Sequence, residues 1–142
     1  MKITLHELIF YWGKSVILNN LPWKLWNRRE MLRTLYKTPY SLSHHLDEVH
    51  EFEIYSIAYN NAKLIDYQIR TMQKFLTDEH KLIIVDNSND LEESQKIAKL
   101  CETSHTGYVK IPNNSLRYSW SHIGALNYTW RNIIKTRACK YI

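Results

Sequence analysis

Residues 54–90 decide the fold of this chain, and they read IYSIAYNN (54–61), AKLIDYQIRTMQKFL (62–76) and, after a short turn, KLIIVDNSND (81–90). The first and third pieces contain short apolar runs of the kind that form buried strands. In the middle piece apolar residues recur at the spacing of one buried helical face. The pattern predicts a β–α–β unit whose two strands both end in small polar residues. Ligands of parallel α/β sheets bind at such strand ends.

The same alternation continues toward the C-terminus. Asp90, with Glu93 three residues later, predicts the start of a helix. A strand over Tyr108–Ile111 follows, and a last helix starts at Ser119 or Ser121. Lys140–Ile142 has the character of a fourth strand. Residues 53–142 are therefore expected to form a Rossmann-like α/β three-layer sandwich, with a mostly parallel sheet in the order βαβαβα(β).

Residues 1–52 are expected to form a helical, basic, amphipathic N-terminal extension. Residues 1–40 hold seven basic and two acidic side chains, whereas the remaining 12 basic and 12 acidic side chains cancel. The clearest helix is Trp23–Lys37, followed by a polar connector over Ser41–Val49. Three interpretations remain open for this helix: attachment to an anionic membrane surface, packing on the domain or on a protein partner, and RNA binding. Because the excess charge is confined to this segment, nucleic-acid binding by the whole domain is not expected.

Composition bounds the class of protein. A chain of 142 residues suits one domain, and a hydrophobic fraction of 44% is ordinary for a globular protein. No apolar run approaches the roughly 20 residues of a membrane-spanning helix. Cys101 and Cys139 have no metal-binding or redox spacing. We therefore expect a cytoplasmic setting, with a peripheral position on the inner membrane surface if the basic helix binds lipid. His44, His45 and His50 lack the spacing of a zinc site, so no metal ligands are assigned.

Three short motifs resemble those of glycosyltransferases of the GT-A type (family 2-like): AYNN at 58–61, VDNS at 85–88 and SWSHIGALN at 119–127. They occur in order at βαβα spacing and cover roughly residues 53–142. The resemblance implies that the ends of the first and second strands bind the nucleoside, and that the helix over 122–127 lies behind a sugar diphosphate. The expected partner is a nucleoside diphosphate sugar.

The chemistry of individual side chains supports a nucleotide site. Asp86 offers a fixed acceptor for a base N–H or ribose hydroxyls. Arg117 is a charge-assisted donor for a diphosphate, and the N-terminus of the last helix favours phosphate. The expected nucleotide-binding residues are Ala58, Tyr59, Asn60, Asp86, Asn87, Ser88, Arg117, Ser121, His122 and Asn127. Each also has a purely structural interpretation, since Asp86 and Asn87 can shape a turn, Asn127 can satisfy backbone groups, and His122 can be a partly buried helix residue.

One departure from the family pattern limits the expected activity. Family members carry an Asp-x-Asp after the fourth strand, where it holds Mn²⁺ or Mg²⁺ on the diphosphate, and a later carboxylate acts as base. The sequence stops at Ile142 before either could occur. We therefore expect the N-terminal, donor-binding half of a glycosyltransferase, with no catalytic residues, no metal bound by this chain alone and no turnover. Self-association through an exposed sheet edge is also expected.

Two alternatives from other classes remain. The first is a non-catalytic α/β binding or assembly module that docks to membrane, RNA or a partner through its basic helix. The second is a response-regulator-like or flavodoxin-like domain, which is disfavoured because no acidic cluster follows the first strand at Tyr59–Asn61. The absence of G-x-G-x-x-G and of a P-loop also removes the glycines that dinucleotide and P-loop sites need.

Overall fold

The computed structural model describes residues 36–47, 49–112, 119–137 and 142. In these residues an α/β domain is formed by four strands, three α-helices and a short 3₁₀ helix. The elements in chain order are β1 (Leu42–His44), β2 (Glu53–Ala58), α3 (Ala62–Phe75), β3 (Lys81–Asp86), α4 (Leu91–Thr103), β4 (Gly107–Lys110), α5 (Ser119–Asn132) and η1 (Ile134–Thr136). The predicted alternation of strands and helices after residue 53 is confirmed.

The four strands form one mixed sheet in the order β1-β4-β3-β2. β2 pairs in parallel with β3, with Ala58 opposite Asp86, and β3 pairs in parallel with β4, with Asp86 opposite Lys110. β1 instead runs antiparallel to β4, with Leu42 opposite Lys110. The carboxyl ends of β2, β3 and β4 consequently meet at one edge of the sheet.

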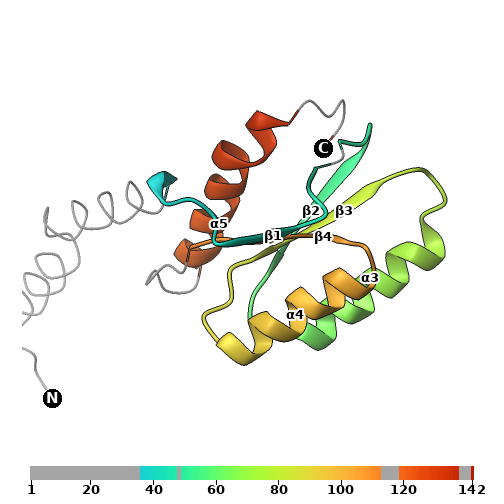
Figure 1. The fold of residues 1–142 in the computed structure, drawn as a ribbon, viewed down its shortest axis with the longest axis horizontal. Helices are drawn as coiled ribbons and strands as arrows, with labels where there is room; N and C mark the ends of the chain where they lie inside the picture. The colour runs from blue at the N-terminus through green and yellow to red at the C-terminus, as the bar shows by residue number, and fades with distance from the viewer. Residues whose placement is uncertain (1–35, 48, 113–118, 138–141) are drawn as a thin grey trace, which may run out of the picture. The chain divides into compact units, whose positions relative to one another are not determined.

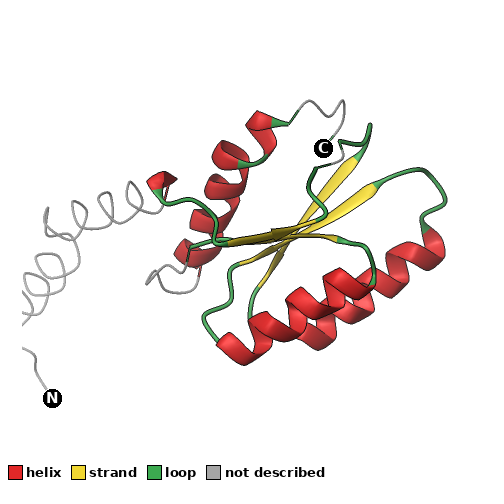
Figure 2. Ribbon diagram, in the orientation of Figure 1, coloured by secondary structure: helices red, strands yellow, loops and turns green. Residues whose placement is uncertain are grey.

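Helices cover both faces of this sheet (Figure 1). α3 and α4 pack side by side on one face, and α5 lies on the other; colouring by secondary structure in Figure 2 makes the layers plain. Leu82 and Ile84 belong to the core cluster beneath α3 and α4, together with Ile65 and Ile97. Because successive strand residues point to opposite faces, Ile83 and Val85 face the α5 side, and all four strand residues are buried.

The short strand β1 corrects one interpretation from the sequence analysis. Ser41–Val49 was interpreted as a polar connector, but Leu42–His44 extends the sheet beyond β4. Its antiparallel pairing makes the sheet mixed, while β2, β3 and β4 run parallel as expected. A three-residue edge strand with exposed Leu42 lacks the apolar run that marks a buried strand, so its pattern gave no signal.

Several expectations fall on residues outside the described part. The basic helix predicted over Trp23–Lys37 falls largely within residues 1–35, and the fourth strand predicted at Lys140–Ile142 falls largely within 138–141. The membrane, partner and RNA interpretations of the basic helix therefore remain predictions. Among the described helices, none combines the length and the apolar character that crossing a bilayer requires.

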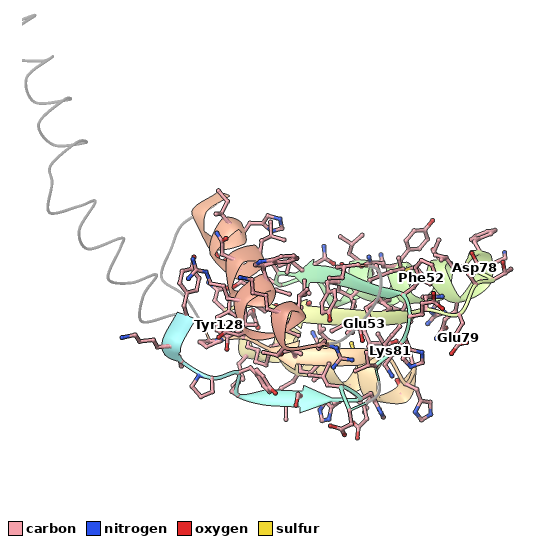
Figure 3. The ribbon with its side chains drawn as sticks, turned by 90° about the horizontal axis from the view of Figure 1, so that it is seen from above. Phe52, Glu53, Asp78, Glu79, Lys81 and Tyr128 are labelled. Atoms are coloured by element: carbon pink, nitrogen blue, oxygen red, sulfur yellow. The ribbon has the colours of Figure 1, made fainter. Side chains whose placement is uncertain are left out.

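A buried ion pair holds the end of the sheet where β2 begins. Glu53 is 1% exposed, and the Arg137 Nε lies 3.0 and 2.9 Å from its two carboxylate oxygens. Figure 3 shows Glu53 and Lys81 at this end of the sheet, with Asp78 and Glu79 in the loop beyond them. Burial raises the pKa of Glu53, but hydrogen bonds from Arg137 and Tyr55 outweigh it, so the pKa lies below its usual value. The stabilising pair is thus remote from the carboxyl ends of the strands.

Candidate functional site: the carboxyl edge of the sheet

Asn60 joins the loop after β2 to the loop after β3. Its side-chain oxygen accepts hydrogen bonds from the backbone N–H groups of Asn89 and Asp90, both at 3.0 Å. Its own backbone N–H donates to the Ser88 hydroxyl at 2.8 Å. Asn60 has φ 47°, a left-handed conformation that Asn tolerates better than most residues. The two polar strand ends that the sequence places 28 residues apart thus form one hydrogen-bonded unit.

Asp86 is the buried centre of this edge. One carboxylate oxygen accepts from the Ser88 backbone N–H at 2.8 Å, and the other accepts from the hydroxyls of Tyr108, at 2.9 Å, and Ser94. The residue is fully buried. Burial raises its pKa, but the hydrogen bonds from Ser88 and Ser94 together with the Lys110 charge outweigh that effect and hold the pKa below its usual value. Asp86 is therefore an ionised anchor whose oxygens already have protein partners.

Lys110 supplies the cation next to that anchor. Its Nζ lies 3.4 Å from an Asp86 oxygen and also donates to the Ser88 backbone carbonyl. The Lys110 side chain is 18% exposed, so it is partly accessible at the end of β4. The cation both balances the buried carboxylate and places positive charge beside the loop after β3.

The start of α5 is fastened to the same edge by Asn87. The Asn87 side-chain amide donates to the Ser121 hydroxyl at 3.0 Å, and both residues are buried. The Asn87 backbone N–H donates to the Ala58 carbonyl at 2.9 Å, which continues the β2–β3 ladder. β2, β3 and the first turn of α5 therefore converge on one residue.

The helices that begin at this edge are capped by side chains. Asn61 accepts from the Leu64 N–H at 3.0 Å at the start of α3, and Asp90 accepts from the Glu93 N–H at 3.1 Å at the start of α4. Glu93 in turn accepts from the Ala62 N–H at 2.8 Å. This backbone hydrogen bond is the main reason that the pKa of Glu93 is lowered. The helix start predicted at Asp90 is confirmed, and the two caps fix the helix N-termini on the strand ends.

The predicted site residues separate into three groups. Asn60, Asp86, Asn87, Ser88 and Ser121 are brought together in the network, with the Ala58 carbonyl beneath it. Tyr59, 52% exposed, flanks it, and His122 is exposed in the first turn of α5. Asn127 is exposed more than one helical turn further along α5, and Arg117 lies outside the described residues.

Sequence reasoning missed four contributors to this edge: Asn89, Ser94, Tyr108 and Lys110. One signal was available, because residues two apart on a strand share a face. Tyr108 and Lys110 flank Val109 on β4 and so lie on one side of the sheet, as Asp86 does with Ile84. The contacts of Ser94 and Asn89 depend on how α4 packs, which the local sequence does not specify.

The edge combines several chemical capabilities. It holds amide groups, a partly exposed cation at the end of β4, an exposed aromatic residue after β2 and the N-terminus of α5. Amides suit hydrogen bonding to bases and hydroxyls, and helix N-termini suit phosphate. Within the described residues no group of three or more His, Cys, Asp or Glu side chains is arranged to hold a metal ion. Comparisons with protein-family models, curated proteins and solved structures found no match.

Proposed function

We propose that this domain is the donor-binding part of a nucleotide-sugar glycosyltransferase, built as a Rossmann-like sheet. Two hydrogen bonds carry the proposal. The Asn60 backbone N–H donates to the Ser88 hydroxyl, and the Asn87 side chain donates to the Ser121 hydroxyl, so the ends of β2 and β3 are joined to the start of α5. These are the three motif segments that resemble the GT-A pattern. Their convergence at the carboxyl ends of parallel strands supports a ligand site there.

In this proposal different residues contact the base, the ribose and the diphosphate of the ligand. Tyr59 meets the base by stacking, and the side-chain nitrogen of Asn89 meets the base or ribose by hydrogen bonds. Asn60 holds Asn89 in place, since both polar atoms of its side chain bond within the protein. His122 and the first turn of α5 meet the diphosphate. Asp86 was expected to bind the base or ribose directly, but its carboxylate oxygens accept hydrogen bonds within the protein, so it is given no direct contact with the ligand. It positions the loop that carries Asn87 and Ser88.

Titration calorimetry with UDP, GDP and CDP, each with and without Mn²⁺, tests this proposal. Tyr59→Ala and His122→Ala alter exposed residues, and stacking on one base is worth about 1–3 kcal/mol, so a loss of affinity of roughly tenfold is expected for Tyr59→Ala. Tyr67→Ala on α3, where Tyr67 is 69% exposed, is the matched control and should bind as the parent does.

The titration also separates the two function classes. Saturable binding of one nucleotide, weakened by Tyr59→Ala and not by Tyr67→Ala, supports the donor-binding function. If the chain is folded and none of the nucleotides produces heat of binding, the donor-binding function is overturned. The non-catalytic module that docks through the basic helix predicted over Trp23–Lys37 then becomes the better account.

A further inference from the structure

A groove between α3 and α4 has the character of a second binding surface, on the helical layer of the domain. Its volume is about 430 Å³. The two helices pack side by side on one face of the sheet (Figure 1). α3 contributes Ala62, Lys63, Asp66 and Arg70, and α4 contributes Lys96, Lys99, Leu100 and Thr103. Both sets of polar wall residues follow the i, i+3, i+7 spacing of one helical face, so the groove runs along roughly two turns, about 10 Å.

The walls of this groove are basic. Four of its lining residues are cations and one, Asp66, is an acid. Asp66 pairs with Arg70 at 2.9 Å, and Lys96 pairs with Glu92 and Glu93 at 2.8 and 3.0 Å. Lys63 and Lys99 have no ion-pair partner among the described residues, and both are exposed. An occupant of the groove therefore meets two uncompensated positive charges, one on each wall.

The lining of the groove also includes Ala62 and Leu100, and these two apolar residues are called its floor. An apolar floor favours an occupant that has apolar side chains as well as negative charge. A polyphosphate or an RNA backbone supplies only the charge. A flat anionic bilayer is disfavoured because Glu92, whose side chain is 79% exposed, and Glu102, also exposed, lie on the same helix and would repel it.

We propose that this groove binds an acidic amphipathic segment of a partner protein. Its carboxylates would pair with Lys63 and Lys99, and its apolar side chains would contact Leu100 and Ala62. The mode is that of a helix lying in a groove, with anchors at i, i+3 and i+7. The inference is independent of the donor site, which lies at the strand ends.

The experiment uses a fluorescein-labelled 15-residue probe peptide with Glu and Leu at amphipathic helical spacing. Fluorescence anisotropy follows its binding to the full chain. Exposed charge pairs are screened by salt, so saturable binding that weakens as NaCl is raised is expected. The double variant Lys63→Glu/Lys99→Glu should lower the affinity at least tenfold. Lys74→Glu/Lys135→Glu changes the net charge equally outside the groove and should lower it less than threefold.

Three further arms make the outcome decisive. Circular dichroism and thermal unfolding establish that both double variants fold. A probe with Ser in place of Leu should bind at least fivefold more weakly, because it lacks apolar contacts with the floor. Equal weakening by both double variants, equal binding of the Ser probe, no binding of the amphipathic probe, or tighter binding of a labelled single-stranded RNA would each overturn the proposal.

Discussion

The side-chain oxygen of Asn60 lies 3.0 Å from the backbone nitrogen of Asp90, and this hydrogen bond ties the loop after β2 to the N-cap of α4. Asn60→Ala removes it together with the bond to Asn89 and leaves a β-carbon at a positive φ. We expect a loss of about 2 kcal/mol in the free energy of unfolding. Urea unfolding measures it, and nucleotide binding should weaken in parallel.

Asn60→Gly is the matched control for that substitution. Glycine adopts a positive φ without strain, so the Asn60→Gly substitution removes the side-chain hydrogen bonds and leaves the backbone conformation unstrained. It should be about 1 kcal/mol more stable than Asn60→Ala. Equal stability of both variants with the parent chain would show that the two loops are not coupled through this side chain.

Tyr108→Phe tests the anchoring of Asp86. The substitution removes the hydroxyl that donates to the buried carboxylate at 2.9 Å and keeps the ring that stacks on His44. Leaving a buried charged acceptor short of one donor costs about 1–3 kcal/mol. Tyr55→Phe, which removes a hydroxyl from Glu53 at the far end of the sheet, is a useful comparison. Only Tyr108→Phe should also disturb nucleotide binding, and equal effects of both on binding would contradict the anchoring role.

Stability should fall in acid because two buried carboxylates have lowered pKa values, Glu53 and Asp86. The unfolded chain takes up protons near the ordinary carboxylate pKa of about 4, while the folded chain takes them up only at lower pH. The two carboxylates therefore contribute their full stabilisation above this pH range, and the free energy of unfolding decreases as the pH falls through it. Chemical denaturation at a series of pH values measures this.

Glu53→Gln isolates the contribution of the ion pair with Arg137. Breaking a buried pair by removing one partner costs about 3 kcal/mol or more, and the loss should be largest near neutral pH. The variant should also show a shallower dependence of stability on pH below about pH 5. An unchanged pH profile in Glu53→Gln would mean that this carboxylate is not ionised in the folded protein.

Self-association through a sheet edge remains a prediction. β1 and β2 are the outer strands of the sheet within the part of the chain that the structure describes. Leu42 on β1 is 44% exposed, and a charge at an edge strand opposes pairing with another edge. Sedimentation velocity should show concentration-dependent dimers that Leu42→Lys removes. A monomer at every concentration would contradict the prediction.

The core of the fold followed from local pattern, and the outer strand did not. The runs around Ile57 and Ile84, with the amphipathic helix between them, had one reasonable interpretation as β–α–β. β1 exists because Leu42 meets Lys110, a pairing over 68 residues of chain that short-range periodicity does not encode. The antiparallel direction of this edge strand likewise depends on long-range contact.

The candidate site was predictable in position more than in detail. Polar residues after two neighbouring parallel strands had to meet at one edge, so Asn60 and Ser88 were expected near each other. The orientation of the Asp86 side chain was not predictable, because an acidic side chain at a strand end can contact a ligand or be buried in the core. Its place on the same strand face as Ile84 turns it toward Tyr108 and α4, where it is buried.

The most direct test of the donor-binding account is amide chemical-shift mapping of the ¹⁵N-labelled chain during titration with the nucleoside diphosphate that binds in calorimetry. The account predicts that the shifts concentrate at residues 59–61, 87–90, 110–111 and 121–122. The amide chemical shifts of Arg70, Lys99 and Thr103, which line the groove beyond the first turn of each helix, should not change. Shifts confined to that groove, or scattered without saturation, would contradict nucleotide binding at the carboxyl edge of the sheet.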